Sequence, residues 1–248
     1  MADIKNIPIL MYHHVMAGDG KLLPDDSSFV SLADFKAQSG VLLAAGFTTL
    51  DFNELGLILD ERMKAPVKPV IICIDDGYAE TLKSVQPVLS GNRQKAVVGL
   101  VTDCIGEFDD WQKARKEYYR IIDEKLVREY SGLCFSFVSH SKTHQFLSRL
   151  SDSELEKELR DSKQTIEELT GIPVNTLIYP YGDRDERVKA GLEAAGYRFG
   201  VSISAKTGYV LEDPLDLRRV YVKKDESIRT FMRKISPWYL WYRGFRRR

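Results

Sequence analysis

A chain of 248 residues, of which 44% are hydrophobic and 29% charged, is long enough to bury one substantial core. Its 36 basic and 36 acidic residues give a formal net charge of zero, and because the first 228 residues are net acidic, no nucleic-acid partner is expected. No stretch approaches eighteen consecutive apolar residues, so no membrane-spanning helix is predicted. The acidic, interrupted N-terminal run lacks a signal-peptide pattern, so we expect a cytoplasmic protein or one peripheral to the inner membrane, or an extracytoplasmic one if a leader has been removed.

Strands and helices are predicted to alternate along most of the chain. Apolar β-branched runs predict strands, and amphipathic segments with polar caps, such as the one from Ser31 to Gly46, predict helices. In chain order the predicted elements are a strand at 7–13, helices at 31–45 and 51–63 separated by a strand at 47–50, a strand at 67–74, a helix at 79–89, a strand at 95–101, a helix at 111–130, a strand at 133–138, a helix at 151–170, a strand at 174–179, a helix at 186–195 and a strand at 197–203. Repeated strand–helix units predict a single-domain α/β fold, a distorted (β/α)7-type barrel over residues 1–225.

The remaining segment, residues 226–248, is predicted to be a basic, aromatic appendage. From residue 229 to the end it carries seven basic residues and no acidic one. Tryptophan and tyrosine favour membrane interfaces and arginine pairs with anionic lipid, so one interpretation is peripheral membrane contact. The alternative is a terminal helix whose aromatic side chains dock on the barrel.

Polar side chains follow four of the predicted strands. His13 ends the first strand, Asp75 and Asp76 follow the strand at 67–74, His140 follows the strand at 133–138, and Pro-Tyr-Gly at 180–182 follows the strand at 174–179. The C-terminal ends of the strands of a β/α barrel share one face, where these enzymes hold their active sites. The four segments are therefore predicted to meet in one pocket.

These residues have the composition of a catalytic metal site. Adjacent carboxylates repel each other unless a cation lies beside them, so Asp76 is a candidate metal ligand and Asp75 a candidate general base. His140 and His144 are spaced so that both imidazoles can face the same ion, and two histidines with one carboxylate leave positions open for water and substrate. Each motif also has a structural interpretation: an Asp-Gly turn for the first, and a helix-capping His144 with a hydrogen-bonded loop residue at His140 for the second.

Three motifs occur in order: Cys-Ile-Asp-Asp-Gly at 73–77, His-Ser-Lys-Thr-His at 140–144 and Ile-Tyr-Pro-Tyr-Gly at 178–182. With these motifs the chain resembles the polysaccharide deacetylases of the NodB-homology type, also called carbohydrate esterase family 4. The resemblance covers about residues 67–203. It implies a hydrolase that removes acetate from a sugar.

The resemblance implies a role for each matching residue. Asp75 is the implied general base, and the backbone N–H of Tyr181 is the implied donor to the oxyanion that forms at the acetyl carbonyl. A divalent metal ion, zinc or alternatively cobalt or nickel, is expected at three ligands, Asp76, His140 and His144. Substrate contacts are expected from Pro180, Gly182 and Tyr78.

Some features of that family are missing from this chain. Ile178 stands where the family has an arginine, no Asp-x-x-Asp-Trp motif follows, and no histidine after His144 can be the late general acid. Met-Tyr-His-His-Val at 11–15 instead resembles the poly-N-acetylglucosamine de-N-acetylase branch, in which the motifs are permuted and a first-strand histidine is the acid. This resemblance implies His13 as the acid and His14 as a packing or loop residue; alternatively, both are surface histidines at a strand end.

The sequence therefore predicts a metal-dependent N-deacetylase that acts on N-acetylhexosamine units of a cell-surface polysaccharide or a glycolipid precursor. The expected partner is this glycan or glycolipid substrate. Two alternatives stay open. One is an O-acetyl esterase with the same site, and the other is a catalytically silent carbohydrate-binding module, which the missing motif residues favour.

Overall fold

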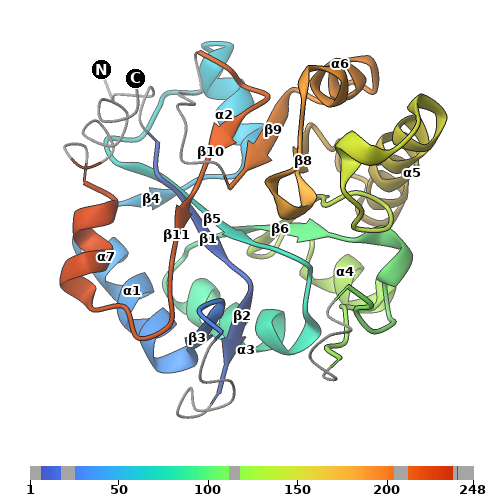
Figure 1. Ribbon diagram of the computed structural model, residues 1–248. Coiled ribbons are helices and arrows are strands. Elements are labelled where there is room, and N and C mark those ends of the chain that lie inside the picture. The colour runs from blue at the N-terminus through green and yellow to red at the C-terminus, as the bar shows by residue number, and fades with distance from the viewer. Residues whose placement is uncertain (1–6, 18–25, 112–117, 204–211, 237–238, 240–248) are drawn as a thin grey trace.

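The computed structural model describes residues 7–17, 26–111, 118–203, 212–236 and 239. Its centre is a set of parallel strands made from the apolar runs of the sequence (Figure 1). Six of them are β1 (Ile9–Tyr12), β5 (Pro69–Ile74), β6 (Ala96–Leu100), β7 (Phe135–Ser139), β8 (Thr176–Ile178) and β9 (Phe199–Ser202). Nearly all of their residues are buried, as expected of parallel strands that are covered on both faces.

One short segment nearly closes this sheet into a barrel. The hydrogen-bonded order is β10-β9-β8-β7-β6-β5-β1-β11, and β10 (Leu217–Arg218) and β11 (Val220–Tyr221) follow each other in the chain. Leu217 pairs with Val201 of β9, and Val220 pairs with Leu10 of β1. The segment thus pairs with both edges of the sheet and takes the place of a seventh barrel strand. The predicted α/β barrel is confirmed.

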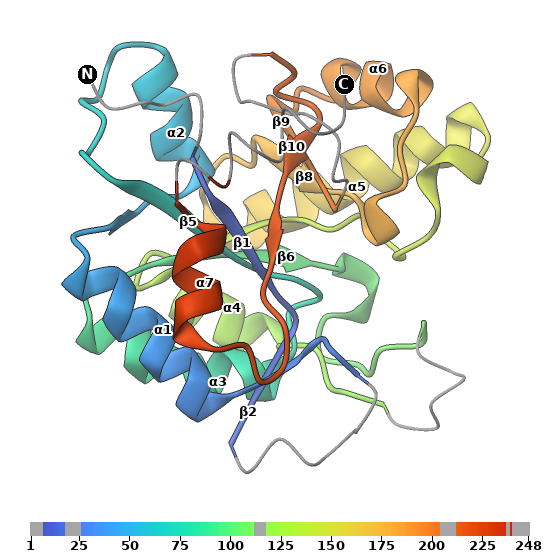
Figure 2. The ribbon, with the colours of Figure 1, turned by 60° about the vertical axis from the view of Figure 1, so that its left-hand side comes forward.

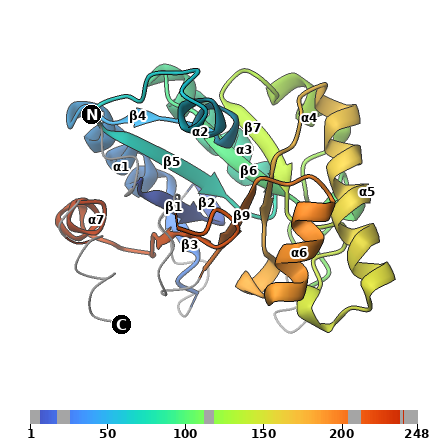
Figure 3. The same ribbon diagram turned by 90° about the horizontal axis from the view of Figure 1, so that it is seen from above.

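Helices cover the outside of the strands (Figures 1 and 3). They are α1 (Leu32–Ala44), α3 (Ala79–Gly91), α4 (Glu124–Tyr130), α5 (Asp152–Thr170) and α6 (Glu186–Ala194). Their ends follow local sequence signals. Ser151 and Glu154 form a capping box at the start of α5, and Gly171, with φ 68°, ends that helix in the left-handed conformation.

The alternation of side chains along the strands divides the core in two. Ile72 and Ile74 of β5 face outward and pack with the helices, whereas Ile71 and Cys73 belong to an inner cluster. Helix α2 (Phe52–Leu59), which follows the two-residue strand β4 (Thr48–Thr49), adds its buried apolar residues to that inner cluster at the starts of β8 and β9. One end of the barrel interior is therefore apolar and closed.

The predicted helix at 111–130 is wrong over residues 118–123, which are not helical. Within the described part, helix α4 begins only at Glu124 behind the N-cap Asp123, and residues 112–117 lie outside the described residues. Ile121 instead forms an antiparallel bridge with Tyr78, and both Ile121 and Ile122 are fully buried. The charged pattern predicts one long helix, but these two adjacent isoleucines are both buried in an extended segment instead.

Four short strands were not predicted, and a helix lies in the C-terminal segment for which a terminal helix was one of two interpretations. Strands β2 (His14–Met16) and β3 (Phe29–Ser31) pair in parallel next to the end of β1, and β10 and β11 follow the last predicted strand. Helix α7 (Ile228–Lys234) contacts α1 (Figure 2), and its Phe231 is fully buried. The boundary at residue 225 and the membrane contact of the tail stay predictions, since residues 240–248 lie outside the described residues. Among the helices that the structure describes, none has the length and apolar character needed to cross a membrane.

Candidate metal centre and active site

The predicted site residues converge inside the barrel at the C-terminal ends of the strands. Asp75, His140 and Arg219 each follow an inner-cluster residue by two positions, so strand alternation directs all three side chains into the barrel. All three are buried, with 1–6% of their surface exposed. The apolar interior thus ends in a polar layer.

Asp76, His140 and His144 form a compact group of potential metal ligands. Asp76 Oδ1 lies 3.4 Å from His140 Nε2 and 3.5 Å from His144 Nε2. One ligand atom from each residue lies within 4.8 Å of the others, and all three residues are buried. The structure therefore brings together the three predicted metal ligands, which come from two separate segments.

Unusual backbone conformations aim these side chains. Asp76, Ser141, His144 and Tyr181 all have positive φ, between 58° and 69°, which side chains other than that of glycine rarely adopt. Such residues cost on the order of 1–3 kcal/mol each and persist only where the surroundings hold them, typically at functional sites.

Glu158 of α5 holds the loop that carries the two histidines. Its carboxylate accepts hydrogen bonds from the backbone N–H groups of Lys142 at 2.8 Å and Thr143 at 2.9 Å, and from the Thr143 hydroxyl at 2.5 Å. Within the loop, the N–H of His144 donates to Ser141 Oγ at 3.0 Å. Sequence reasoning missed Glu158, because an acidic residue within a charged helix has no local mark that separates it from its solvent-exposed neighbours.

Second contacts fix the orientation of both imidazole rings. His140 Nδ1 donates to the carbonyl oxygen of Ile178 at 2.7 Å, which leaves Nε2 facing Asp76. His144 Nδ1 lies 3.2 Å from the Tyr181 hydroxyl, and the Trp111 ring packs against the His144 ring with 4.3 Å between centroids. The Nε2 atoms of both histidines therefore face Asp76 Oδ1.

The electrostatics of the group suit a cation. Burial raises the pKa of Asp76, but the hydrogen bond from His140 and the charge of His144 outweigh it and hold that pKa well below the usual value. Burial and the neighbouring His140 lower the pKa of His144 to about 3, so this ring is neutral near pH 7. Burial opposes the charged form of His140 as well, yet the hydrogen bond with Asp76 and the charge of Asp75 raise its pKa. One carboxylate and two imidazoles, oriented and buried in this way, fit a divalent metal ion.

Asp75 is held by an arginine that the sequence analysis missed. Arg219 Nη1 donates to Asp75 Oδ1 at 2.5 Å, and the two side chains are 1% and 2% exposed. Burial by itself raises the pKa of Asp75, but the charges of Arg219 and His13 lower it below its usual value. The structure thus places a buried arginine beside the candidate base, although Ile178 stands where the resemblance implies one. A signal was present: two adjacent arginines, at 218 and 219, interrupt an otherwise apolar run at 217–222.

The two histidines at the end of β1 have different surroundings. His13 Nε2 lies 3.7 Å from Asp75 Oδ2, and the His13 side chain is 24% exposed. His14 is 2% exposed and its ring stacks between Phe29 and Tyr78, each with 4.1 Å between centroids. His13 is therefore placed beside the candidate base, while His14 packs in an aromatic wall.

A cavity of about 750 Å³ opens over these groups. Asp75, Asp76, His140 and His144 lie at its lining together with His13, Arg219, Trp111 and Tyr181. The other predicted substrate contacts are placed differently. Pro180, Gly182 and Tyr78 are buried and do not line the cavity, and the Tyr78 hydroxyl donates to Asp109 at 3.2 Å. Instead they adjoin residues that do line it: Pro180 and Gly182 flank Tyr181, and the Tyr78 ring stacks on His14.

The sequence and the fold of the chain are similar to those of known deacetylases. A family model described as polysaccharide deacetylase matches residues 62–200. The protein YxkH of Bacillus subtilis (strain 168), named as a polysaccharide deacetylase, is 27% identical over 79% of this chain, which spans 64% of the length of that relative. Among solved structures, the deacetylase PplD of Streptococcus pyogenes in complex with acetate has a TM-score of 0.81, 20% identity, and coverage of 93% of this chain and 98% of its own. A de-N-acetylase from Aggregatibacter actinomycetemcomitans has a TM-score of 0.77, 15% identity, and coverage of 93% and 99%.

Proposed function

Because the chain belongs to the polysaccharide deacetylase family, whose members are carbohydrate-deacetylating hydrolases, we propose that it is a metal-dependent N-deacetylase of N-acetylhexosamine units. The substrate would be a cell-surface polysaccharide or a glycolipid precursor. The proposed location is cytoplasmic or peripheral to the inner membrane, which fits a precursor that is still being assembled, or extracytoplasmic if a leader has been removed.

One observation carries the proposal. A buried carboxylate, Asp75, is held ionised by Arg219 directly beside the three potential metal ligands at one cavity. A general base must lie within reach of the water it activates and must be unprotonated at the working pH. A silent binding module has no need of a base that is so strongly oriented, so the arrangement favours an enzyme.

The chain's own groups have complementary tasks in amide hydrolysis. Asp75 takes a proton from the water molecule that attacks the acetyl carbonyl carbon, and the backbone N–H of Tyr181 donates a hydrogen bond to the oxygen that becomes negative. His13 then gives a proton to the departing sugar nitrogen as the C–N bond breaks. The products are acetate and a free amine.

Asp76, His140 and His144 would hold the metal ion, with zinc the expected ion and cobalt or nickel as alternatives. When bound, the ion polarises the carbonyl and lowers the pKa of water. The buried, oriented imidazole rings are ready for this role because their outer nitrogens are already engaged by Ile178 and Tyr181.

Two relations support a sugar N-acetyl substrate. The Aggregatibacter protein of the same fold is a de-N-acetylase, and PplD was solved with acetate, the product of such a reaction. The leaving amine also needs an acid, and His13 stands at the cavity beside the base. An ester, whose alcohol leaves more easily, depends less on such an acid, so His13 favours amide over ester hydrolysis.

The test is mass spectrometry of N-acetylglucosamine oligosaccharides and of O-acetylated oligosaccharides after incubation with the zinc-loaded protein. We expect acetyl loss from nitrogen, abolished in Asp75→Asn and reduced by roughly 100-fold or more in His13→Gln. Asp60→Asn, which changes an exposed carboxylate paired with Arg198, is the matched control and should keep full activity. Full activity of Asp75→Asn would refute the proposed base, and acetyl loss only from oxygen would make the protein an esterase.

A further inference from the structure

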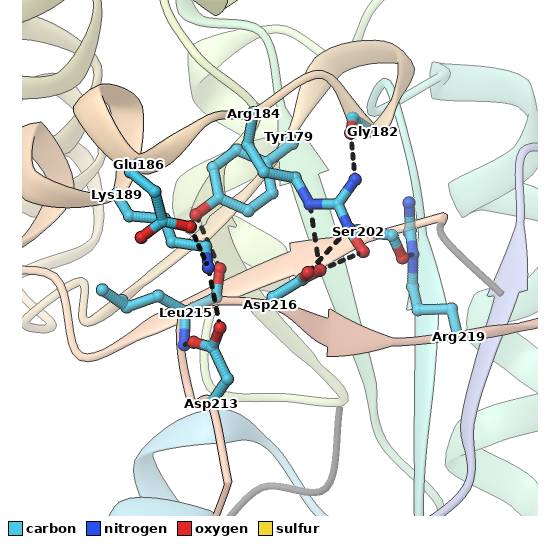
Figure 4. Close-up of polar contacts among 10 residues, drawn as sticks. All are labelled: Tyr179, Gly182, Arg184, Glu186, Lys189, Ser202, Asp213, Leu215, Asp216 and Arg219. Carbon is cyan, nitrogen blue, oxygen red and sulfur yellow. Dashed lines mark hydrogen bonds and ion pairs between the residues drawn. The ribbon is translucent and has the colours of Figure 1, made fainter. Parts of the chain in front are cut away.

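Outside the cavity, a bidentate ion pair joins two segments that both end at the reaction centre (Figure 4). Arg184 Nε lies 3.0 Å from Asp216 Oδ1, and Arg184 Nη2 lies 2.7 Å from Asp216 Oδ2. The two side chains are 19% and 17% exposed, and neither residue lines the cavity. They therefore have no direct contact with a substrate placed there.

On one side the pair holds the turn η5 (Pro180–Gly182). Arg184 Nη1 donates to the carbonyl oxygen of Gly182 at 3.0 Å. The turn needs such support because Tyr181 has φ 58° and Gly182 has φ 68°. The turn carries the Tyr181 N–H, the proposed oxyanion donor, so Arg184 stabilises the position of that donor.

On the other side, Asp216 is connected to the candidate base, Asp75, through Ser202 and Arg219. Asp216 Oδ1 accepts a hydrogen bond from Ser202 Oγ at 2.7 Å, and the carbonyl oxygen of Ser202 accepts one from Arg219 Nε at 3.3 Å. Arg219 in turn donates to Asp75. A continuous set of polar contacts thus runs from the Gly182 carbonyl to Arg219 (Figure 4), and from Arg219 to the Asp75 carboxylate.

The segment that carries Asp216 is also anchored by contacts that do not involve the Arg184 or Asp216 side chains. Tyr179 donates its hydroxyl to the carbonyl oxygen of Leu215 at 2.7 Å, Lys189 pairs with Asp213 at 2.7 Å, and the N–H of Gly200 donates to the carbonyl oxygen of Pro214 at 2.9 Å. Loss of the Asp216 charge should therefore leave this segment in place and release only its links to Arg184 and Ser202.

We propose that Arg184 and Asp216 are positioning residues that fix the Pro180–Gly182 turn and the Asp75–Arg219 pair relative to each other. The inference rests on the proposed hydrolytic function, since that function gives the two ends of the network their roles. Displacement of a reacting group by about 1 Å is enough to slow a reaction roughly 100-fold. A bidentate, mostly buried pair restricts relative movement more than a single exposed contact does.

The kinetic test compares Asp216→Asn with Asp60→Asn. Asp60 forms an equally close bidentate pair with Arg198, at 2.7 and 2.8 Å, between α2 and the start of β9, away from the cavity. With an N-acetylglucosamine oligosaccharide and zinc, we expect Asp216→Asn to lose roughly 10- to 100-fold in kcat with an unchanged KM. Zinc affinity should also be unchanged. Asp60→Asn should keep the wild-type kcat.

Arg184→Lys and a double variant sharpen this result. Arg184→Lys keeps the charge but cannot bond Asp216 twice and Gly182 at once, so its kcat should be intermediate. Arg184→Gln combined with Asp216→Asn should be no slower than the slower single variant, because both changes break the same pair. Additive losses, or losses that appear in KM or zinc affinity alone, would overturn the positioning role.

Amide hydrogen exchange provides a readout that does not need activity. Asp216→Asn should speed exchange both over residues 179–184 and over residues 217–221, while Asp60→Asn should leave both unchanged. Faster exchange over one segment only, or over neither, would refute the coupling. If the wild-type protein deacetylates no acetylated sugar and the double effect on exchange is still seen, the proposed function fails and the coupling of the two segments stands.

Discussion

Replacing Arg219 by methionine tests whether the buried pair with Asp75 is the key polar contact inside the barrel. The side chains are 1% and 2% exposed, so the variant leaves a carboxylate in the interior without its main counter-charge. Breaking a buried ion pair from one side typically costs about 3–5 kcal/mol, and methionine keeps the length of the lost aliphatic stem. We expect a loss of this size in the free energy of unfolding near neutral pH.

The pH dependence has a defined sign. In the wild-type protein the pKa of Asp75 is lowered on folding, so its stabilising effect is present above the unfolded value, about 3.9, and is lost as the pH falls through the folded value. In Arg219→Met the burial of Asp75 is no longer offset by Arg219, so its pKa rises relative to the wild-type protein. The gap in stability between the two proteins should therefore shrink from pH 7 towards about pH 4, as the lone carboxylate takes up a proton.

The assay is urea denaturation of metal-free protein at both pH values, so that bound ion does not contribute to stability. Arg219→Met combined with Asp75→Asn should recover much of the loss, because no unpaired charge remains. Arg198→Met, which breaks a pair that is 39% and 43% exposed, should cost less than about 1 kcal/mol. A loss below about 1 kcal/mol for Arg219→Met, or one that is equal at both pH values, would refute the reasoning.

Three further predictions concern the metal and its supports. Glu158→Gln should weaken zinc binding roughly 10- to 100-fold in calorimetric titration, whereas Glu156→Gln on the exposed side of the same helix should not. Equal affinities would show that the loop that carries His140 and His144 keeps its conformation without Glu158. Gly182→Ala should lower the melting temperature more than Gly196→Ala. Both positions have positive φ, but a Cβ on Gly182 would lie 2.7 Å from Ile203, whereas one on Gly196 meets no atom within 4 Å. Equal melting temperatures would contradict the clash. A chelator should abolish acetate release and added zinc should restore it, with unchanged circular dichroism; activity that resists chelation would exclude the proposed metal dependence.

The local part of the fold could be predicted from the sequence because the signals are local. Continuous apolar runs marked the buried strands, and capping residues such as Ser151 marked the helix ends. The failure at residues 118–123 has the same origin, because charge spacing is a weak signal beside the burial of Ile121 and Ile122. Periodicity describes a segment by itself, while burial depends on what the rest of the chain brings to it.

The candidate metal ligands and the candidate base could be predicted from the sequence. Asp75 and Asp76 are adjacent, and His140 and His144 are four residues apart, so their spacing in the sequence already suggested a shared ion. The order of the strands then brought ligand atoms of Asp76, His140 and His144 within 4.8 Å of one another at the same barrel end.

Only the tertiary structure decided what holds these residues. Arg219 is 144 positions from Asp75 in the sequence, and the two meet because residues 217–221 pair with β9 at one end and with β1 at the other. Glu158 reaches the histidine loop because α5 packs against β7. Sequence alone determined which groups could perform the chemistry, since that depends on residue type and short spacing. The closure of the barrel determined which charges surround them, since that depends on contacts between segments far apart in the chain.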